Sequence, residues 1–145
     1  FTQKAKWFYF LYGGERFRVY QILVPNENIK KFLDDLTELI KGLKPNLTII
    51  VLKPFRGDQK FLQFCGNGMS VILEIKNSIS DQNFLSKLDE LTIYHHAIPY
   101  IIKDSRLSKR VTEECYPEYA QFKEFLKKID PDRIFKSEIS QRLDL

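Results

Sequence analysis

Residues 16–45 read RFRVYQILVPNENIKKFLDDLTELIKGLKP, and this stretch decides the fold. The β-prone run Arg16–Val24 predicts a strand, which ends at Pro25 because proline cannot donate to a strand ladder. Asn26 then suits the N-cap of a helix that ends by Pro45. Along that helix the apolar residues recur with the 3.6-residue period of one buried face: Ile29, Phe32, Leu33, Leu36, Leu39 and Ile40.

The same alternation of strand and helix continues along the chain. Leu47–Phe55 and Met69–Lys76 are dense apolar runs that predict two further strands. Ser80 suits the cap of a second helix, and Ile98–Ile102 predicts a short last strand. The resulting order, β-α-β-β-α-β, is typical of a ferredoxin-like antiparallel sheet with both helices on one face. The first and third strands of this unit are expected at the centre.

Both ends of the chain add elements to this unit. Lys6–Tyr12 predicts a hairpin strand that extends the sheet at one side. After the last strand the sequence is helical: Pro117 suits the first turn of a helix that is broken at Asp130, and a short final turn starts near Ser137. We therefore predict an α+β fold in one domain, residues 1–145, with an extra N-terminal hairpin strand and C-terminal helices.

The composition limits the classes of function. The chain is 43% hydrophobic and 29% charged, as in globular proteins, and its net charge is +4. A basic domain can bind phosphate, nucleic acid or an anionic membrane, but charges that alternate in sign along helices indicate solvated faces. The strand Met69–Lys76 has no aromatic residue for stacking bases, so we expect no nucleic-acid partner.

Other sequence features point away from membrane insertion and from metals. No apolar run approaches the roughly 20 residues that span a bilayer, and no signal-peptide pattern opens the chain. We therefore expect a cytoplasmic location, free or at the membrane surface. Cys65 and Cys115 match no metal-ligand spacing and are interpreted as reduced thiols. His95 and His96 are adjacent and have no third ligand nearby, so no metal site is predicted.

Side-chain alternation divides the predicted sheet into two faces. The helix side is expected to hold Tyr20, Ile22, Val24, Thr48, Ile50, Leu52, Met69, Val71, Leu73 and Ile75. The opposite side, called the open face below, carries Gln21, Lys53, Ser70 and Glu74 among Val19, Val51, Phe55 and Ile72. A few polar groups on an apolar floor are typical of a surface that covers a ligand. The alternative is a face packed on the C-terminal helices, with Lys53 and Glu74 in an ion pair.

The segment Tyr100–Arg106 reads Tyr-Ile-Ile-Lys-Asp-Ser-Arg. Together with Tyr116-Pro117, Asp130–Phe135 and Ser137–Leu143, it resembles the C-terminal part of FAD-linked oxidases of the vanillyl-alcohol oxidase superfamily. Upstream, Val51–Phe55 resembles that family's Lys-x-Phe strand. The likeness is greatest to the branch that oxidises prenyl-phospho sugars.

Two departures from related patterns leave the substrate open. Sugar-lactone and alditol oxidases carry His-Trp-x-Lys where this chain has Tyr100 and Ile101, which points away from those enzymes, and an aldonolactone or alditol oxidase is kept as the alternative within the family. The prenyl-phospho sugar branch has Asn and Cys at the places of Ser70 and Ile72, and neither is kept here.

The resemblance implies the substrate-side, or cap, domain of a longer FAD-dependent oxidoreductase. Such an enzyme oxidises a hydroxyl of a sugar or a lipid-linked prenyl-phospho sugar by hydride transfer to flavin. The resemblance also implies an N-terminal FAD-binding domain outside this chain, and a reductase or epimerase as a further partner. Since the chain has no glycine-rich phosphate loop, we expect it to bind FAD poorly and to be inactive alone.

The resemblance also assigns site residues. The Lys of the family's Tyr-x-x-Lys falls on Lys103, which implies a catalytic lysine that stabilises negative charge on reduced flavin or orients the substrate hydroxyl. The positions that line the substrate and flavin cavity are Gln21, Lys53, Phe55, Ser70, Ile72 and Tyr100. The alternative for Lys103 is a surface lysine paired with Asp104. The alternative for the whole chain is a free-standing ferredoxin-like binding module without catalysis.

Overall fold

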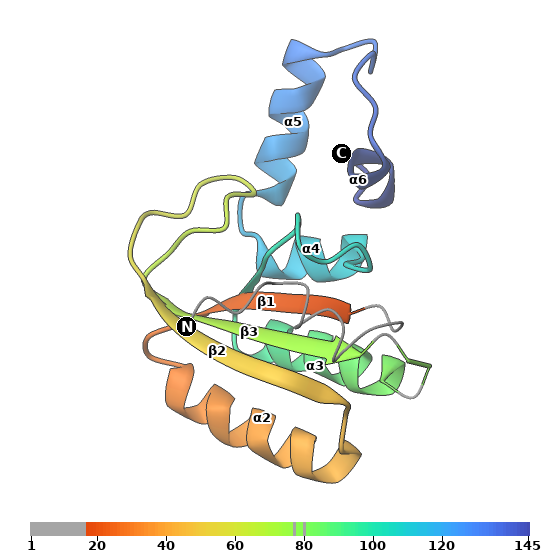
Figure 1. The fold of residues 1–145 in the computed structure, drawn as a ribbon. Helices are drawn as coiled ribbons and strands as arrows, with labels where there is room; N and C mark the ends of the chain where they lie inside the picture. Colours follow the sequence, from red (N-terminus) through yellow and green to blue (C-terminus); the bar gives the residue numbers. More distant parts are fainter. Residues whose placement is uncertain (1–16, 77, 80) are drawn as a thin grey trace, which may run out of the picture.

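The computed structural model describes residues 17–76, 78–79 and 81–145. Within them a four-stranded antiparallel sheet has the strand order β2-β3-β1-β4 (Figure 1). The strands are β1, Phe17–Pro25; β2, Leu47–Phe55; β3, Gly68–Lys76; and β4, Ile98–Pro99. The predicted α+β class and the central places of the first and third strands are confirmed. The predicted hairpin strand Lys6–Tyr12 lies outside the described residues.

In the part of the chain that the structure describes, five helices cover the two sides of the sheet. They are α2, Ile29–Leu43; α3, Gln82–Tyr94; α4, Lys109–Cys115; α5, Tyr119–Ile129; and α6, Glu138–Arg142. In Figure 1, α2 and α3 lie on one side, whereas α4, α5 and α6 lie on the other. None of the described helices has the length and apolar composition needed to cross a bilayer. The two sides of the sheet are therefore covered by different sets of helices.

The starts of two helices and the length of one strand differ from the predictions. Asn26 is not a cap, because a turn in which Asn28 N–H donates to the Pro25 carbonyl (3.0 Å) delays the start of α2 to Ile29. The predicted cap Ser80 lies outside the described residues, and Asp81 is the residue that precedes α3. The predicted length of the last strand, Ile98–Ile102, is wrong, because the strand ends at Pro99 and a turn follows.

The main core fills the space between the sheet and helices α2 and α3. It contains Tyr20, Ile22, Val24, Phe32, Leu36, Val71, Leu73, Ile75, Phe84, Leu85, Leu88 and Ala97. The alternation predicted for the two central strands is thus confirmed. On β2 it is only half right, because Ile50 and Leu52 share the helix-side register but remain 42% and 46% exposed. An edge strand has a neighbour on one side only, so the helices leave it partly uncovered.

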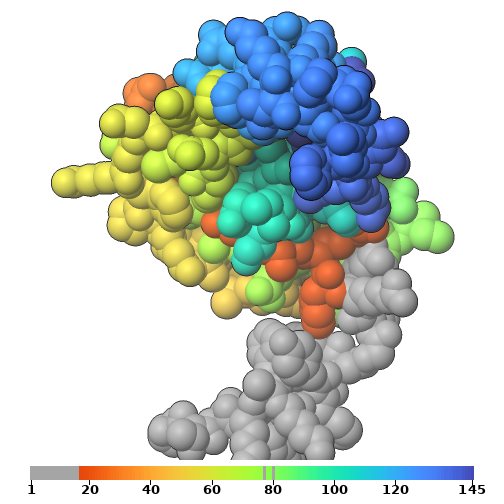
Figure 2. Space-filling view, turned by 90° about the horizontal axis from the view of Figure 1, so that it is seen from above, coloured from red at the N-terminus to blue at the C-terminus, as the bar shows by residue number. Residues whose placement is uncertain are grey.

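A second core lies on the opposite side, above β1 and β4. It is formed by Ile101, Leu107, Val111, Cys115, Tyr116, Tyr119 and Leu143. The C-terminal helices and the loop that follows β2 therefore cover much of the open face (Figure 2, blue and yellow). The alternative of a face packed on the C-terminal helices is correct for this part of the sheet, and the remainder is the candidate site described next.

Candidate functional site

A buried polar pair lies at the centre of the open face. Gln21 is 8% exposed and Ser70 is fully buried. The Gln21 Nε2 donates to Ser70 Oγ over 3.0 Å, which gives each group a partner across the two central strands. Gln21 faces Ile72 in the strand register, and its carbonyl accepts from Tyr100 N–H at 2.8 Å. Four of the seven predicted site residues are thus in direct contact or in register.

Lys53 places a cation beside this pair. It lies on β2 directly opposite Ser70 and is exposed. Glu74 pairs instead with Ile49, further along the strand. Over residues 17–76, 78–79 and 81–145 no carboxylate lies within 4 Å of the Lys53 ammonium, so the expected alternative of a Lys53–Glu74 ion pair is wrong.

An aromatic cluster connects the ends of β2 and β4. Phe64, in the loop after β2, stacks on Tyr100 with ring centres 4.6 Å apart and planes at 22°. The same ring meets Phe55 edge-on at 5.5 Å. The predicted residues Phe55 and Tyr100 are therefore joined through a third ring that the sequence analysis missed. The signal was an aromatic residue in the glycine-containing loop between two paired strands.

The loop after β2 is held over the face by contacts with α5. Phe61 stacks on Phe125 at 5.7 Å and meets Phe122 at 5.6 Å. Its N–H donates to Glu118 Oε2 at 2.7 Å. These contacts connect the loop to the C-terminal helices, and they position Phe64 against Tyr100.

Lys103 lies in a turn that begins at Tyr100. Its N–H donates to the Tyr100 carbonyl at 3.0 Å, and its side chain is exposed. Asp104 is occupied by Arg106, which reaches its Oδ2 over 3.0 Å. In the part of the chain that the structure describes, Lys103 has no ion-pair partner, so the alternative of a Lys103–Asp104 pair is wrong.

The sequence analysis also missed a buried polar network on the helix side. Arg106 donates from Nη1 and Nη2 to both oxygens of Asp89 on α3, at 2.5 and 2.8 Å. Asp89 also accepts from the hydroxyl of Tyr20 at 2.9 Å, and that hydroxyl lies 2.9 Å from Thr92 Oγ1. The available signal was Tyr20 on the predicted buried face, because a buried tyrosine hydroxyl needs a partner.

The charge states in this network are fixed by the surroundings. Burial, together with the negative charge of Asp89, raises the pKa of Tyr20 well above its ordinary value. Burial disfavours the charged form of Arg106, but its hydrogen bonds to Asp89 and the charge of Asp104 outweigh this and raise its pKa. Tyr20 therefore stays neutral and Arg106 stays charged over the physiological range, as expected of a structural network.

The other segments that resemble the oxidase family, around Tyr116, Asp130 and Ser137, also have structural roles. The hydroxyl of Tyr116 donates to the Pro99 carbonyl at 2.5 Å. Asp130 accepts from the N–H groups of Ile134 and Phe135 at 2.8 and 3.0 Å. Ser137 caps α6. These residues fix the ends of helices and turns, and none of them touches the polar pair or the ring cluster through a described hydrogen bond.

The two histidines lie on the opposite side, at the end of α3. His95 is buried and its Nε2 is 2.8 Å from Asp35 Oδ2, whereas His96 is exposed. Among the described residues no group of three His, Cys, Asp or Glu could hold a metal ion. Both cysteines, Cys65 and Cys115, are free.

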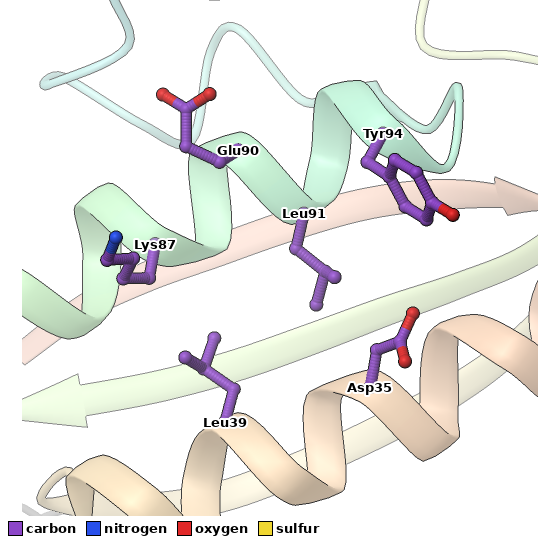
Figure 3. Close-up of a pocket in the computed structure, with 6 residues that line it drawn as sticks. All are labelled: Asp35, Leu39, Lys87, Glu90, Leu91 and Tyr94. Atoms are coloured by element: carbon purple, nitrogen blue, oxygen red, sulfur yellow. The ribbon is translucent and has the colours of Figure 1, made fainter.

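A groove of about 370 Å³ runs between α2 and α3, away from the open face. It is lined by Asp35, Leu39, Lys87, Glu90, Leu91 and Tyr94, and Figure 3 shows these side chains on the two facing helices. No predicted site residue lines it. The groove is therefore separate from the candidate site.

Taken together, the open-face side of the sheet holds a half-buried pair of stacked rings, Phe64 and Tyr100, a buried Gln21–Ser70 pair and an exposed lysine, Lys53. Aromatic rings with a few hydrogen-bonding groups are the kinds of side chain that line ligand sites. Lys103 follows three residues after the stacked Tyr100.

Comparison with known proteins finds a distant relative. The chain is 27% identical over 135 residues to decaprenylphosphoryl-beta-D-ribose oxidase of Mycolicibacterium smegmatis. The alignment covers 92% of this chain but only 29% of that protein. The similarity is distant and partial, and it agrees with the resemblance found in the sequence. No protein-family profile matches the chain.

Proposed function

We propose that this chain is the substrate-side part of an FAD-dependent oxidoreductase that oxidises a hydroxyl of a sugar or of a prenyl-phospho sugar. The observation that carries the proposal is the similarity to a sugar-phosphoprenyl oxidase along 92% of the chain. The gathering of Gln21, Ser70, Lys53 and Tyr100 on one face supports it. Because the chain spans under a third of that relative, the FAD-binding domain is proposed to lie elsewhere in a longer polypeptide.

The ring end of FAD is proposed to lie beside the stacked pair of Phe64 and Tyr100. Both rings are half-buried, and their exposed parts are proposed to pack against the flavin ring. Lys53 and Lys103 are exposed, and the described part of the chain offers neither of them an ion-pair partner, so both are free to face an anion. The sequence has no glycine-rich phosphate loop, so the pyrophosphate is proposed to be held by the other domain.

Each side chain has a proposed task. FAD, when bound, supplies the acceptor for the two electrons that leave the substrate alcohol. Lys103 is proposed to stabilise the negative charge that accumulates near the ring, or to orient the substrate hydroxyl. Ser70 is fully buried and is proposed to hold Gln21 in place, and the remaining hydrogen-bonding capacity of the Gln21 amide is proposed to serve the ligand. The ring cluster excludes water from that side of the site.

The fold is proposed to be ferredoxin-like, on the strand order β2-β3-β1-β4 and the two helices on one side. The substrate is proposed to be a sugar or a lipid-linked sugar, with a reductase or epimerase as the partner that uses the oxidised product. Ser70 and Ile72 replace the family's Asn and Cys, so a sugar different from ribose is within the proposal. An aldonolactone or alditol is the second substrate class to be tested.

The test uses the full-length polypeptide that contains this chain. Flavin bleaching under anaerobic conditions is measured with sugars, lactones, alditols and prenyl-phospho sugars. The variant Lys103→Ala is expected to slow flavin reduction on the order of 10²–10³-fold. Lys41→Ala, which removes an exposed lysine paired with Glu38 on α2, is the matched control and should reduce at the wild-type rate.

Three outcomes would count against the proposal. A full-length protein without flavin favours the binding-module alternative. Bleaching by lactones or alditols alone moves the substrate to the alternative class. A wild-type rate in Lys103→Ala removes Lys103 from the mechanism.

A further inference from the structure

We propose that Asp89, Arg106 and Arg142 are positioning residues that fix the turn carrying Lys103. The inference rests on the proposed function of Lys103, because a positioning role requires a group to position. It goes beyond that function because none of the three lies on the open face. They reach the turn from α3, from the turn itself and from α6.

The turn is closed from inside by Asp104. The N–H groups of Lys103 and Asp104 donate to the Tyr100 carbonyl at 3.0 and 3.3 Å. The Asp104 carboxylate accepts from Arg106 N–H at 2.8 Å, and its carbonyl accepts from Leu107 N–H at 3.3 Å. Asp104 and Leu107 are both buried, so this loop of backbone is set into the protein and does not stand free of it.

Arg106 connects the turn to α3. One side of its guanidinium binds Asp104 at 3.0 Å, and the same group binds both oxygens of Asp89 at 2.5 and 2.8 Å. A two-point contact between a guanidinium and a carboxylate fixes orientation as well as distance. Asp89 is in turn fixed by the hydroxyl of Tyr20 on the central strand β1. The turn is thereby connected to the main core.

Arg142 holds the same turn from the opposite direction. Its Nη1 donates to the carbonyls of Asp104 and Leu107, at 3.1 and 2.7 Å. Asp104 and Leu107 lie before and after Arg106 in the sequence, so Arg142 binds the backbone of the turn on both sides of Arg106. The C-terminal helix α6 therefore stabilises the turn through one side chain, and the arginine of the Ser137–Leu143 motif has a structural explanation.

Lys103 itself depends on this clamp. Its side chain is exposed, and no carboxylate in the described ranges lies within 4 Å of its ammonium. Its position is therefore set by the backbone of residues 100–107 and not by contacts of its own. A shift of about 1 Å in a reacting group can cost on the order of 10²-fold in rate, so the stiffness of this turn bears directly on the reaction.

The test compares Arg106→Gln with Arg110→Gln in the full-length flavoprotein. Arg110 lies close in sequence, on α4, and its ion pair among the described residues, with Glu90, is exposed. In Arg106→Gln, amide hydrogen exchange of Lys103, Asp104 and Leu107 is expected to accelerate about ten-fold or more, while the amides of α2 are unchanged. Flavin reduction at saturating substrate should fall on the order of ten- to a hundred-fold, with unchanged substrate affinity. Arg110→Gln should change neither quantity.

Either of two results overturns the inference. Unchanged exchange in the turn means that Arg106 does not hold it. Faster exchange with a wild-type rate of flavin reduction means that the clamp is structural and does not position Lys103. If Arg106→Gln does not fold, Arg142→Gln is measured in its place with the same expectations. Lys103→Ala, run in parallel, separates the two proposals, because a wild-type rate in that variant refutes the role of Lys103 and leaves the exchange result to decide the clamp.

Discussion

The replacement Arg106→Met tests how much the contact between the turn after β4 and helix α3 contributes to the free energy of unfolding. The side chains of Asp89 and Arg106 are 11% and 24% exposed, so their mutual contact is largely shielded from water. The substitution leaves the Asp89 carboxylate buried with the Tyr20 hydroxyl as its remaining described partner. Removing one member of a buried ion pair typically costs about 3–5 kcal/mol, because the other charge stays desolvated. We expect a loss of free energy of unfolding in that range.

The control and the second variant separate the buried charge from the loss of an arginine. Arg110→Met removes an ion pair with Glu90 whose side chains are 56% and 58% exposed, so it should cost at most about 1 kcal/mol. The double variant Asp89→Asn with Arg106→Met removes the stranded charge. It should therefore cost less than the sum of the two single changes, by about 2 kcal/mol.

The assay is urea unfolding of the chain, followed by circular dichroism, with the wild-type transition as reference. The slope of the transition should be unchanged, since the exposed area on unfolding is the same. A free energy for Arg106→Met within about 1 kcal/mol of that for Arg110→Met would refute the reasoning, because it would mean that the network is solvated or is readily replaced.

Two further outcomes follow from single positions. Gly68→Ala should abolish folding or cost several kcal/mol, since a Cβ at Gly68 would lie 2.1 Å from the Val24 carbonyl oxygen. In contrast, a Cβ at Gly42 meets no atom within 4 Å, so Gly42→Ala should stabilise α2 by up to about 1 kcal/mol. Thermal unfolding measures both changes. Burial raises the pKa of the Cys115 thiol to about 12, so Cys115 should resist alkylation by iodoacetamide at pH 8 while the half-buried Cys65 reacts, as read by mass spectrometry. Because the folded chain holds that proton more tightly than the unfolded chain, its contribution to stability should decline as pH rises from about 9 towards 12, and equal alkylation of both thiols in the folded state would contradict the burial.

The strand faces could be predicted because alternation is a local property. Once Tyr20 and Leu73 face the helices, Gln21 and Ile72 must face the other way, and the structure bears this out. The exposure of Ile50 could not be predicted in the same way. It depends on which strand lies at the edge, and that is a property of the whole sheet.

The end of the last strand was missed for a related reason. The apolar run from Ile98 to Ile102 is equally compatible with a strand and with a buried turn, and the local pattern does not separate them. The structure resolves this at Tyr100, whose carbonyl accepts two N–H groups of its own turn. The turn is also stabilised by Arg106 and Arg142, which both bind Asp104. These two partners lie farther along the chain, and the local apolar pattern does not predict their contacts.

The seven-residue motif from Tyr100 to Arg106 therefore divides into two kinds of residue. Asp104 and Arg106 bind each other, and Arg106 also binds Asp89 on α3, so these structural contacts account for both residues without a catalytic role. Lys103 is different, because in the described part of the chain its exposed ammonium has no ion-pair partner and contributes no described hydrogen bond to the frame. Its presence has no structural explanation there. Because the contacts that hold the turn do not involve this ammonium, Lys103→Ala tests the proposed catalytic role without breaking them.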